Sequence, residues 1–281
     1  MVVLWSCENI MSENDKLNTG ILKGVGLEID IWLNDLLPRG WRKGRRPHFS
    51  NGTTYKELKE SLENRERQLH CTSLVSAIDK TLHRNLAKVK RRQPSPENWR
   101  FEPHPEISDK NESPEVCLER EIVRLRKRSN WANQSPVASG LLGADSDKGR
   151  HVDLVREVEP SIAYELIELK WGADNPFFAA MEILCYGLIY LLFREKFPQE
   201  DKPLLQASTI HLRVLAPEDF YRGKRAKSVL KAFELQISEA VRKHAARLGI
   251  KMDFRYLRIP FSKVAKVIIE ADDDTGMPSA F

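Results

Sequence analysis

The stretch AYELIELKW, residues 163–171, has the apolar character of a buried β-strand but also carries Glu165, Glu168 and Lys170. Side chains alternate between the two faces of a strand, so Glu168 and Lys170 share one face with Leu166. Charged side chains are costly to bury unless each has a partner. The stretch therefore indicates either an ion pair or a functional site at the end of a core strand.

The preceding stretch RHVDLVREV, residues 150–158, is a second run rich in β-branched residues, and the Glu159-Pro160 pair that follows it is typical of a turn. We therefore expect a β-hairpin, in which Asp153 lies on the strand next to Glu168. Two carboxylates that converge in this way repel each other unless a cation lies between them. Hard oxygen ligands of this kind favour Mg²⁺ or Mn²⁺.

The rest of the second half of the chain predicts alternating helices and strands. Helices are expected where apolar residues recur at helical spacing, and strands where β-branched residues cluster. The expected helices cover 115–128, 176–196 and 225–249, and the further strands cover 206–216 and 251–260. This order favours an α/β fold of the α+β type, in which helices cover a mixed sheet.

Composition predicts three regions. Residues 1–110 form a basic, partly helical N-terminal extension, with one or two helices in 55–92 and a Pro-rich linker or wrapping segment in 93–114. Residues 111–270 form the main domain, and residues 271–281 form an acidic tail.

The overall composition excludes several classes of protein. The 281 residues include 41% hydrophobic side chains, enough to bury a core, so the chain is not a disordered protein. The four cysteines lie far apart with no C-x-x-C spacing, which indicates neither a disulfide framework nor a zinc site. The first residues lack the basic region of a secretory signal. We therefore expect a cytoplasmic protein.

The run FFAAMEILCYGLIYLLF, residues 177–193, is apolar enough to be considered as a membrane span. Glu182 lies in its middle, where a charge costs about 2.5–3.5 kcal/mol on insertion scales. An apolar helix that directly follows a strand is also typical of the core of an α/β protein. We therefore expect a buried helix and no membrane association, with a membrane-associated protein as the weaker alternative.

Asp153 in RHVDLV and Glu168-x-Lys170 in LIELK together resemble the motif of the PD-(D/E)xK nuclease superfamily, although Val152 stands in place of the proline. The resemblance covers about residues 115–260. It implies a restriction-endonuclease-like core and a metal-dependent deoxyribonuclease, with internal cleavage preferred over cleavage from the ends.

The resemblance also implies a role for each residue at the site. Asp153, Glu168 and the carbonyl of Leu169 would bind Mg²⁺ or Mn²⁺, which polarises the phosphate and activates a water molecule. Lys170 would orient or deprotonate that water and offset charge in the transition state. No covalent nucleophile is needed for this chemistry.

Further site residues are expected beside these four. Family members add an acid on the first helix, where this chain offers Glu119 and Glu121, and Glu121 is preferred because it borders the apolar stripe of that helix. The RecB-like exonuclease branch carries Q-x-x-x-Y on the helix after the lysine, and here Glu182 and Tyr186 occupy those places, with glutamate replacing glutamine. His151 is a further candidate, with an ordinary exposed histidine as the alternative.

Basic runs at 38–48, 88–92 and 124–128 favour nucleic acid as the partner, with DNA preferred. A homodimer is compatible with the sequence. The competing hypothesis is a non-catalytic nucleic-acid-binding or assembly module on the same fold, in which the charges form a structural ion pair. The residues expected to contact nucleic acid are Arg42, Lys43, Arg45, Arg46, Lys90, Arg91 and Arg92.

Overall fold

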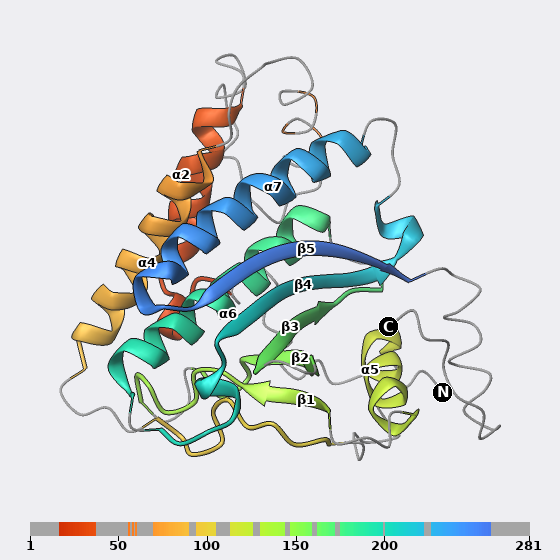
Figure 1. The fold of residues 1–281 in the computed structure, drawn as a ribbon. Coiled ribbons are helices and arrows are strands. Elements are labelled where there is room, and N and C mark those ends of the chain that lie inside the picture. The colour runs from red at the N-terminus through yellow and green to blue at the C-terminus, as the bar shows by residue number, and fades with distance from the viewer. Residues whose placement is uncertain are drawn as a thin grey trace, which may run out of the picture.

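The computed structural model describes the following residues: 17–37, 56, 58, 60, 70–89, 94–104, 113–125, 130–143, 147–158, 162–171, 175–198, 200–221 and 226–259. In these parts of the chain, helices cover a five-stranded mixed sheet (Figure 1). The α/β class predicted from the sequence is therefore confirmed.

The strands lie in the sheet in their order along the sequence: β1 (Trp131–Pro136), β2 (His151–Val158), β3 (Ala163–Leu169), β4 (Thr209–Pro217) and β5 (Lys251–Ile259). β2 pairs antiparallel with both β1 and β3, whereas β4 pairs parallel with both β3 and β5. The predicted hairpin is confirmed as β2 and β3. β1 was not predicted, because WANQSP has neither a β-branched run nor clear alternation.

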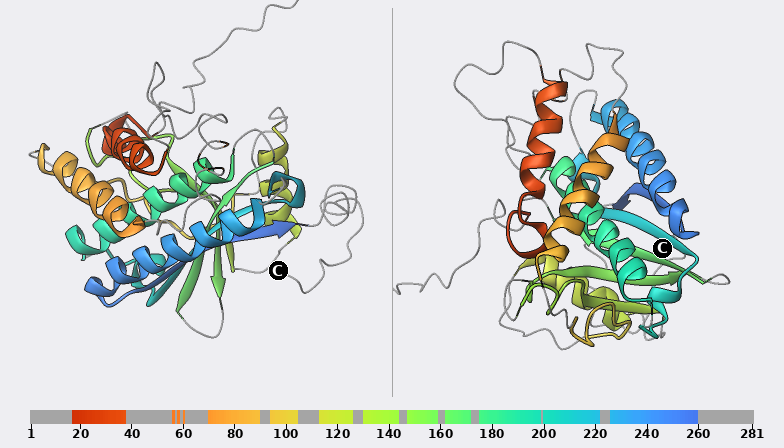
Figure 2. Two further views of the ribbon diagram at one scale, coloured as in Figure 1. Left: turned by 90° about the horizontal axis from the view of Figure 1, so that it is seen from above. Right: turned by 90° about the vertical axis from the view of Figure 1, so that its left-hand side faces the viewer.

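The described helices and 3₁₀ turns are η1 (Gly20–Leu22), α2 (Val25–Leu36), α4 (Cys71–Ala87), α5 (Pro114–Leu125), α6 (Pro176–Lys196), η2 (Leu204–Gln206), η3 (Glu218–Tyr221), α7 (Ala226–Ala245) and η4 (Ala246–Leu248). α6 connects β3 to β4 and α7 connects β4 to β5, so each helix provides the crossover that parallel strands require. Figure 2 shows α2, α4, α6 and α7 on one face of the sheet and α5 on the other.

Alternation along β3 divides its apolar side chains between two cores. Leu166 belongs to the large core that includes α2, α4, α6 and α7, whereas Ile167 belongs to a smaller core with Leu118 and Ile122 of α5. β3 is buried along its whole length, since every residue from Ala163 to Leu169 is buried. A strand covered on both faces explains why AYELIEL is so apolar.

α6 is the central helix of the large core. It begins after Asn175, whose side-chain oxygen accepts a hydrogen bond from Phe178 N at 2.8 Å. Gly187 allows close approach to β4, because a Cβ atom there would lie 2.7 Å from a methyl carbon of Leu212. Among the described helices, α6 is the one long and apolar enough to cross a membrane, and its apolar stretch is fully buried inside the protein. The buried helix predicted here is therefore present in the core.

The N-terminal residues are part of the same large core. Leu17, Ile29 and Leu74 are buried in the cluster that contains α6. α2 was not predicted, whereas α4 lies within the helical region expected at 55–92. The described part of the predicted linker, residues 94–104, wraps against this core through the fully buried Trp99. The division into an extension and a main domain stays a prediction, and the acidic tail lies outside the described residues.

A buried ion pair joins the N-terminal segment to the loop before β2. Arg150 Nε lies 2.8 Å from Asp147 Oδ1, and both side chains are almost completely buried. Arg150 also donates to the carbonyl and hydroxyl oxygens of Thr19, each at 2.8 Å, while Ile21 N donates to Asp147 Oδ1 at 3.0 Å. The first described turn is therefore fixed to the loop that leads into β2.

Two cysteines lie deep in this core. Cys71 begins α4 and Cys185 lies in the middle of α6, and both thiols are buried and free. Burial raises the pKa of Cys71 to about 12, and it also raises the pKa of Cys185.

Candidate active site

Asp153 lies where the pairing of β2 with β3 ends. The last paired residues are Leu154 and Ile167. Beyond them, Leu169 N donates a hydrogen bond to the Asp153 side chain at 2.8 Å, and not to a backbone carbonyl of β2. On the other side, the β1 register skips Gln134, which has a φ of 49°. A non-glycine residue in this conformation is uncommon and often marks a functional position.

Lys170 is held between two carboxylates. Its Nζ atom lies 2.9 Å from Glu168 Oε1 and 3.1 Å from Glu182 Oε2. The backbone N–H of Lys170 donates to Leu215 O at 3.0 Å, which fixes the residue to β4. Tyr186, one turn further along α6, donates its hydroxyl to Glu182 Oε1 at 3.4 Å. The structure thus brings Glu168, Lys170, Glu182 and Tyr186 together.

Glu168 is incompletely satisfied within the described parts of the chain. Its Oε1 atom contacts Lys170, but its buried Oε2 atom has no hydrogen-bond partner there. A buried carboxylate oxygen without a donor is costly, so such an atom calls for an explanation. A bound cation would supply the missing partner.

The acid that α5 directs toward the site is Glu119, not the preferred Glu121. Glu119 is buried and accepts hydrogen bonds from Asn133 Nδ2 at 2.8 Å and Gln134 Nε2 at 2.6 Å. Its charge interacts with that of Asp153. Glu121 instead pairs with Arg124 at 3.3 Å. The structure therefore places Glu119, and not the preferred Glu121, close to Asp153.

Helix phase explains this difference. Glu115, Leu118, Glu119 and Ile122 follow the i, i+3, i+4, i+7 pattern of a single helix face. Glu115 accepts a hydrogen bond from Trp171 N at 2.9 Å, while Leu118 and Ile122 pack in the small core against the sheet. Glu121 lies off this face. Glu115 was not predicted, although its position one turn before Glu119 could have indicated it.

The pKa values of three carboxyl groups at the site, Asp153, Glu119 and Glu168, are all raised. Burial raises the pKa of Asp153 to about 6, with Lys170 and the Leu169 N–H opposing the shift. Burial and then repulsion from Asp153 raise the pKa of Glu119 to about 8. Burial, followed by repulsion from Asp153 and Glu182, holds the pKa of Glu168 well above its ordinary value. The site therefore carries more negative charge than its surroundings stabilise.

Tyr186 experiences the same excess of negative charge. Burial, then repulsion from Glu182 and Glu168, keep the pKa of its hydroxyl well above the usual range. The phenol is therefore neutral at physiological pH and acts as a hydrogen-bond donor.

The arrangement fits a two-carboxylate cation site and not a protein cage. Within the described residues, no group of three or more His, Cys, Asp or Glu side chains is placed to hold a metal ion. Magnesium commonly uses one or two carboxylates and completes its shell with water and substrate oxygens. Asp153, which is partly exposed, and the unsatisfied Oε2 of Glu168 suit that mode.

The remaining predicted residues are His151 and the basic residues expected to contact nucleic acid. His151 begins β2 opposite Pro136 and is partly buried. The predicted nucleic-acid contacts, Arg42, Lys43, Arg45, Arg46, Lys90, Arg91 and Arg92, lie outside the described residues.

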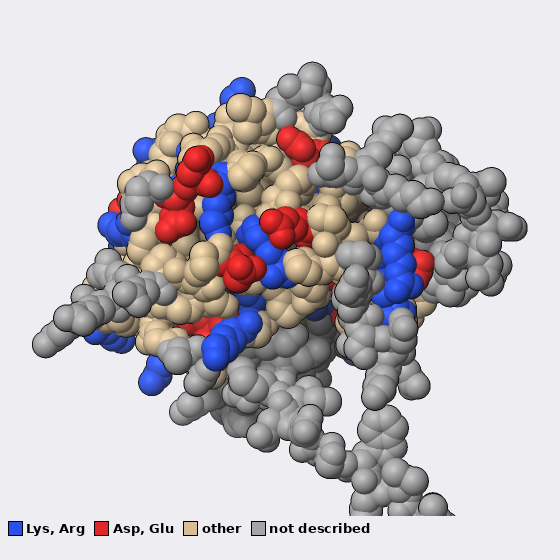
Figure 3. Space-filling model, turned by 90° about the horizontal axis from the view of Figure 1, so that it is seen from below, with Lys and Arg blue, Asp and Glu red and all other residues tan. Residues whose placement is uncertain are grey.

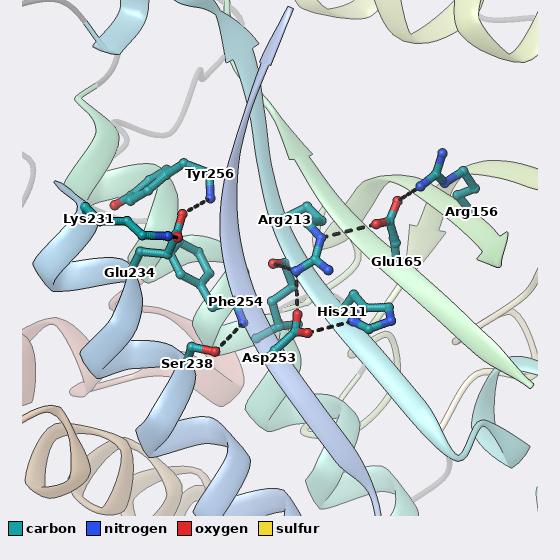
Figure 4. A network of polar contacts seen from close by, with 11 residues as sticks. Arg156, Glu165, His211, Arg213, Lys231, Glu234, Ser238, Asp253, Phe254 and Tyr256 are labelled. Carbon is teal, nitrogen blue, oxygen red and sulfur yellow. Dashed lines mark hydrogen bonds and ion pairs between the residues drawn. The ribbon is translucent and has the colours of Figure 1, made fainter. Parts of the chain in front are cut away.

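Glu165, the third charged residue of the opening stretch, belongs to a separate network across the sheet (Figure 4). It lies 2.6 Å from Arg156 and 3.2 Å from Arg213, and Arg213 also contacts Asp253 at 2.5 Å. His211 lies 3.0 Å from Asp253. Each of its two acids, Glu165 and Asp253, lies beside at least one arginine, so the carboxylates of this network are matched by cations. Figure 3 likewise shows basic and acidic side chains interspersed on the face seen from below.

No family model, curated protein or solved structure matches the chain.

Proposed function

We propose that the chain is a metal-dependent nuclease that hydrolyses phosphodiester bonds, with DNA as the expected substrate and internal cleavage preferred. The observation that carries the proposal is the meeting of Asp153 and Glu168 at the ends of neighbouring strands, with Lys170 beside them. Carboxylates that are buried and repel each other are expected at sites built to receive a cation.

The topology supports a restriction-endonuclease-like core. One helix, α5, precedes the antiparallel strands β1, β2 and β3, and α6 then crosses to the parallel strand β4. The candidate residues lie on β2, β3, α5 and α6. This is the arrangement that the resemblance to the PD-(D/E)xK superfamily implies.

The roles follow from the contacts. Asp153, Glu168 and the Leu169 carbonyl would hold Mg²⁺ or Mn²⁺, which supplies Lewis acidity toward a phosphate oxygen and a water molecule when bound. Lys170 would position that water and stabilise developing negative charge. Glu182 holds the Lys170 ammonium from the α6 side, and Glu119 orients the amides beside Asp153.

A second function is favoured by a different observation. Lys170 already contacts both Glu168 and Glu182, and the described residues contain no three-ligand metal group. These contacts also suit a non-catalytic nucleic-acid-binding or assembly module in which Lys170 is a structural counter-ion.

Cleavage assays with a Lys170→Ala variant separate the two functions. Labelled linear DNA, circular DNA and RNA would be incubated with Mg²⁺, Mn²⁺ or EDTA. We expect the wild type to cut circular DNA only with a divalent cation. Lys170→Ala should lose about 100-fold or more in rate, in the range of general acid–base contributions, while retaining binding.

Lys251→Ala serves as the matched control, because Lys251 is an exposed lysine at the start of β5. It should cut like the wild type. Absence of cutting under all metal conditions, or equal loss of binding and cutting in Lys170→Ala, would favour the non-catalytic module.

A further inference from the structure

A groove with a volume of about 680 Å³ runs between α7 and the edge strand β5. Lys231 lines it from the helix, and Arg255 and Arg258 line it from the strand. Both arginines are exposed, and Leu235 adds an exposed apolar side chain. Glu234 is the acid in the wall, and it is paired with Lys231 at 2.5 Å. The groove therefore presents a net positive charge.

Arg258 is held in a defined orientation. Its guanidinium carbon lies 5.6 Å from the centre of the Tyr221 ring. The Tyr221 hydroxyl donates to Val214 O and Leu257 O, each at 3.0 Å, so the ring itself is fixed between β4 and β5. A guanidinium stacked on a fixed ring loses little entropy when it binds an anion.

The groove lies at the same end of the sheet as the candidate active site. Leu169, Leu215 and Leu257 are in register across β3, β4 and β5, and Lys170 and Arg258 each follow by one residue. Two strand spacings of about 4.8 Å separate their backbones by about 10 Å. That distance equals about three base-pair rises of 3.4 Å along the axis of a duplex.

The edge of β5 is closed to an extended peptide. Phe254 N donates to Ser238 Oγ at 3.4 Å and Tyr256 N donates to Glu234 Oε2 at 2.9 Å, as Figure 4 shows. A peptide that added a strand here would have to displace both α7 side chains. The exposed cations remain available, which favours a ligand recognised through phosphates.

We propose that the groove between α7 and β5 binds a phosphodiester strand of nucleic acid, with Arg258 contacting a phosphate inside the groove. Arg255, whose side chain alternates to the other face of β5, would contact a neighbouring phosphate around the edge of that strand. The direction of the bound nucleic-acid strand, from Lys170 toward Arg258, rests on the proposed nuclease function. Leu235 provides an apolar surface for a sugar or base.

Binding measurements with Arg255→Gln/Arg258→Gln test the proposal. Fluorescence anisotropy would be recorded in EDTA with a labelled 20-nucleotide DNA, its duplex, and the RNA of the same sequence, over a series of salt concentrations. Loss of two phosphate contacts should weaken binding about tenfold or more at 0.1 M salt and reduce the salt slope by about 1.4 to 1.8. Arg255→Lys/Arg258→Lys should keep most of the slope, because it keeps the charge.

The matched control is Lys251→Gln/Arg84→Gln, which removes two exposed cations outside the groove. It should change affinity less than about twofold, in line with scattered surface charges. Melting temperatures of all variants would be compared to confirm folding. An equal effect of the control, an unchanged salt slope, or equally strong competition by polyglutamate would overturn the proposal.

Cleavage with Mn²⁺, measured on the same variants, separates the two proposals. If the wild type binds through the groove but never cuts, the nuclease fails and the groove stands. If the arginine variants bind and cut like the wild type, the groove fails and the nuclease stands.

Discussion

Lys170 stabilises a group of side chains that would otherwise repel each other. Its ammonium contacts Glu168 and Glu182 within 3.1 Å, and its charge also favours ionisation of Asp153. One cation nevertheless leaves the site short of positive charge, since the pKa values of Asp153 and Glu168 are raised. The shortage distinguishes this site from the network around Glu165, in which charges are matched.

Asp153→Asn tests whether this shortage is real. The pKa of Asp153 is raised from 3.8 to about 6, so its stabilising contribution is present below about pH 4 and is lost as the pH rises through 6. At pH 7.5 in EDTA the neutral asparagine should therefore stabilise the protein, by about 3 kcal/mol at most, given about 1.4 kcal/mol per pKa unit. Its side-chain oxygen can still accept the hydrogen bond from Leu169 N.

Thermal melts at pH 4 and pH 7.5, with EDTA or Mn²⁺, provide the measurement. The advantage of Asp153→Asn should vanish at pH 4, and Mn²⁺ should raise the Tm of the wild type but not of the variant. A wild type indifferent to Mn²⁺, beside a variant destabilised in EDTA, would instead identify a structural ion pair.

At the scale of elements, sequence periodicity predicted the helices and strands that have a clear local pattern. It missed β1, whose residues are fixed by tertiary contacts. The β-branched runs indicated β2 and β3, and the cap at Asn175 indicated the start of α6. β1 could not be recognised from the sequence, because it contains the polar residues Asn133 and Gln134 in place of β-branched ones. Their side-chain amides donate hydrogen bonds to Glu119, and the backbone at Gln134 is irregular. α2 carried a readable signal in the helical spacing of Val25, Ile29, Trp32, Leu33 and Leu36.

The site was predictable in part for the same reason. Strand alternation placed Glu168 and Lys170 on one face, and the expected hairpin placed Asp153 on the neighbouring strand. The choice between Glu119 and Glu121 required the rotation of α5 about its axis, which the small core fixes. Three apolar residues of this helix, Leu118, Ile122 and Leu125, form a stripe with Glu119 on one side and Glu121 on the other. The sequence alone therefore did not decide which of the two acids faces the site.

Glu119→Gln and Glu121→Gln form a matched pair that tests the phase of α5. Glu119 hydrogen-bonds both amides beside Asp153, so its replacement should lower cleavage about 10- to 100-fold, as for groups that orient metal ligands. Glu121→Gln, on the same helix but paired with Arg124, should leave the rate unchanged. Equal rates for the two variants would remove Glu119 from the site.

At the scale of the whole molecule, the N-terminal residues support the sheet that carries the site. Arg150 and Asp147 connect Thr19 and Ile21 to the loop before β2, three residues from Asp153. α2 and α4 also bury their apolar faces in the core that surrounds α6. The first described helix is therefore part of the structure that positions the site.

Arg150→Met tests this connection. It leaves the buried Asp147 carboxylate without its guanidinium partner, so the free energy of unfolding should fall by about 3–5 kcal/mol. Urea denaturation at pH 7 provides the measurement. Arg242→Met removes an exposed pair with Glu239 on α7 and should leave the free energy of unfolding nearly unchanged. Equal losses of unfolding free energy in the two variants would show that the Arg150–Asp147 pair contributes no more than a surface pair.

The buried thiols of Cys71 and Cys185 allow the local opening of α4 and α6 to be followed by chemical labelling. Only a thiolate reacts readily with alkylating reagents, and burial disfavours the thiolate at both positions. Each thiol can therefore be labelled only after its own helix opens to solvent. The labelling rate of Cys71 measures opening at the start of α4, and that of Cys185 measures opening at the centre of the molecule.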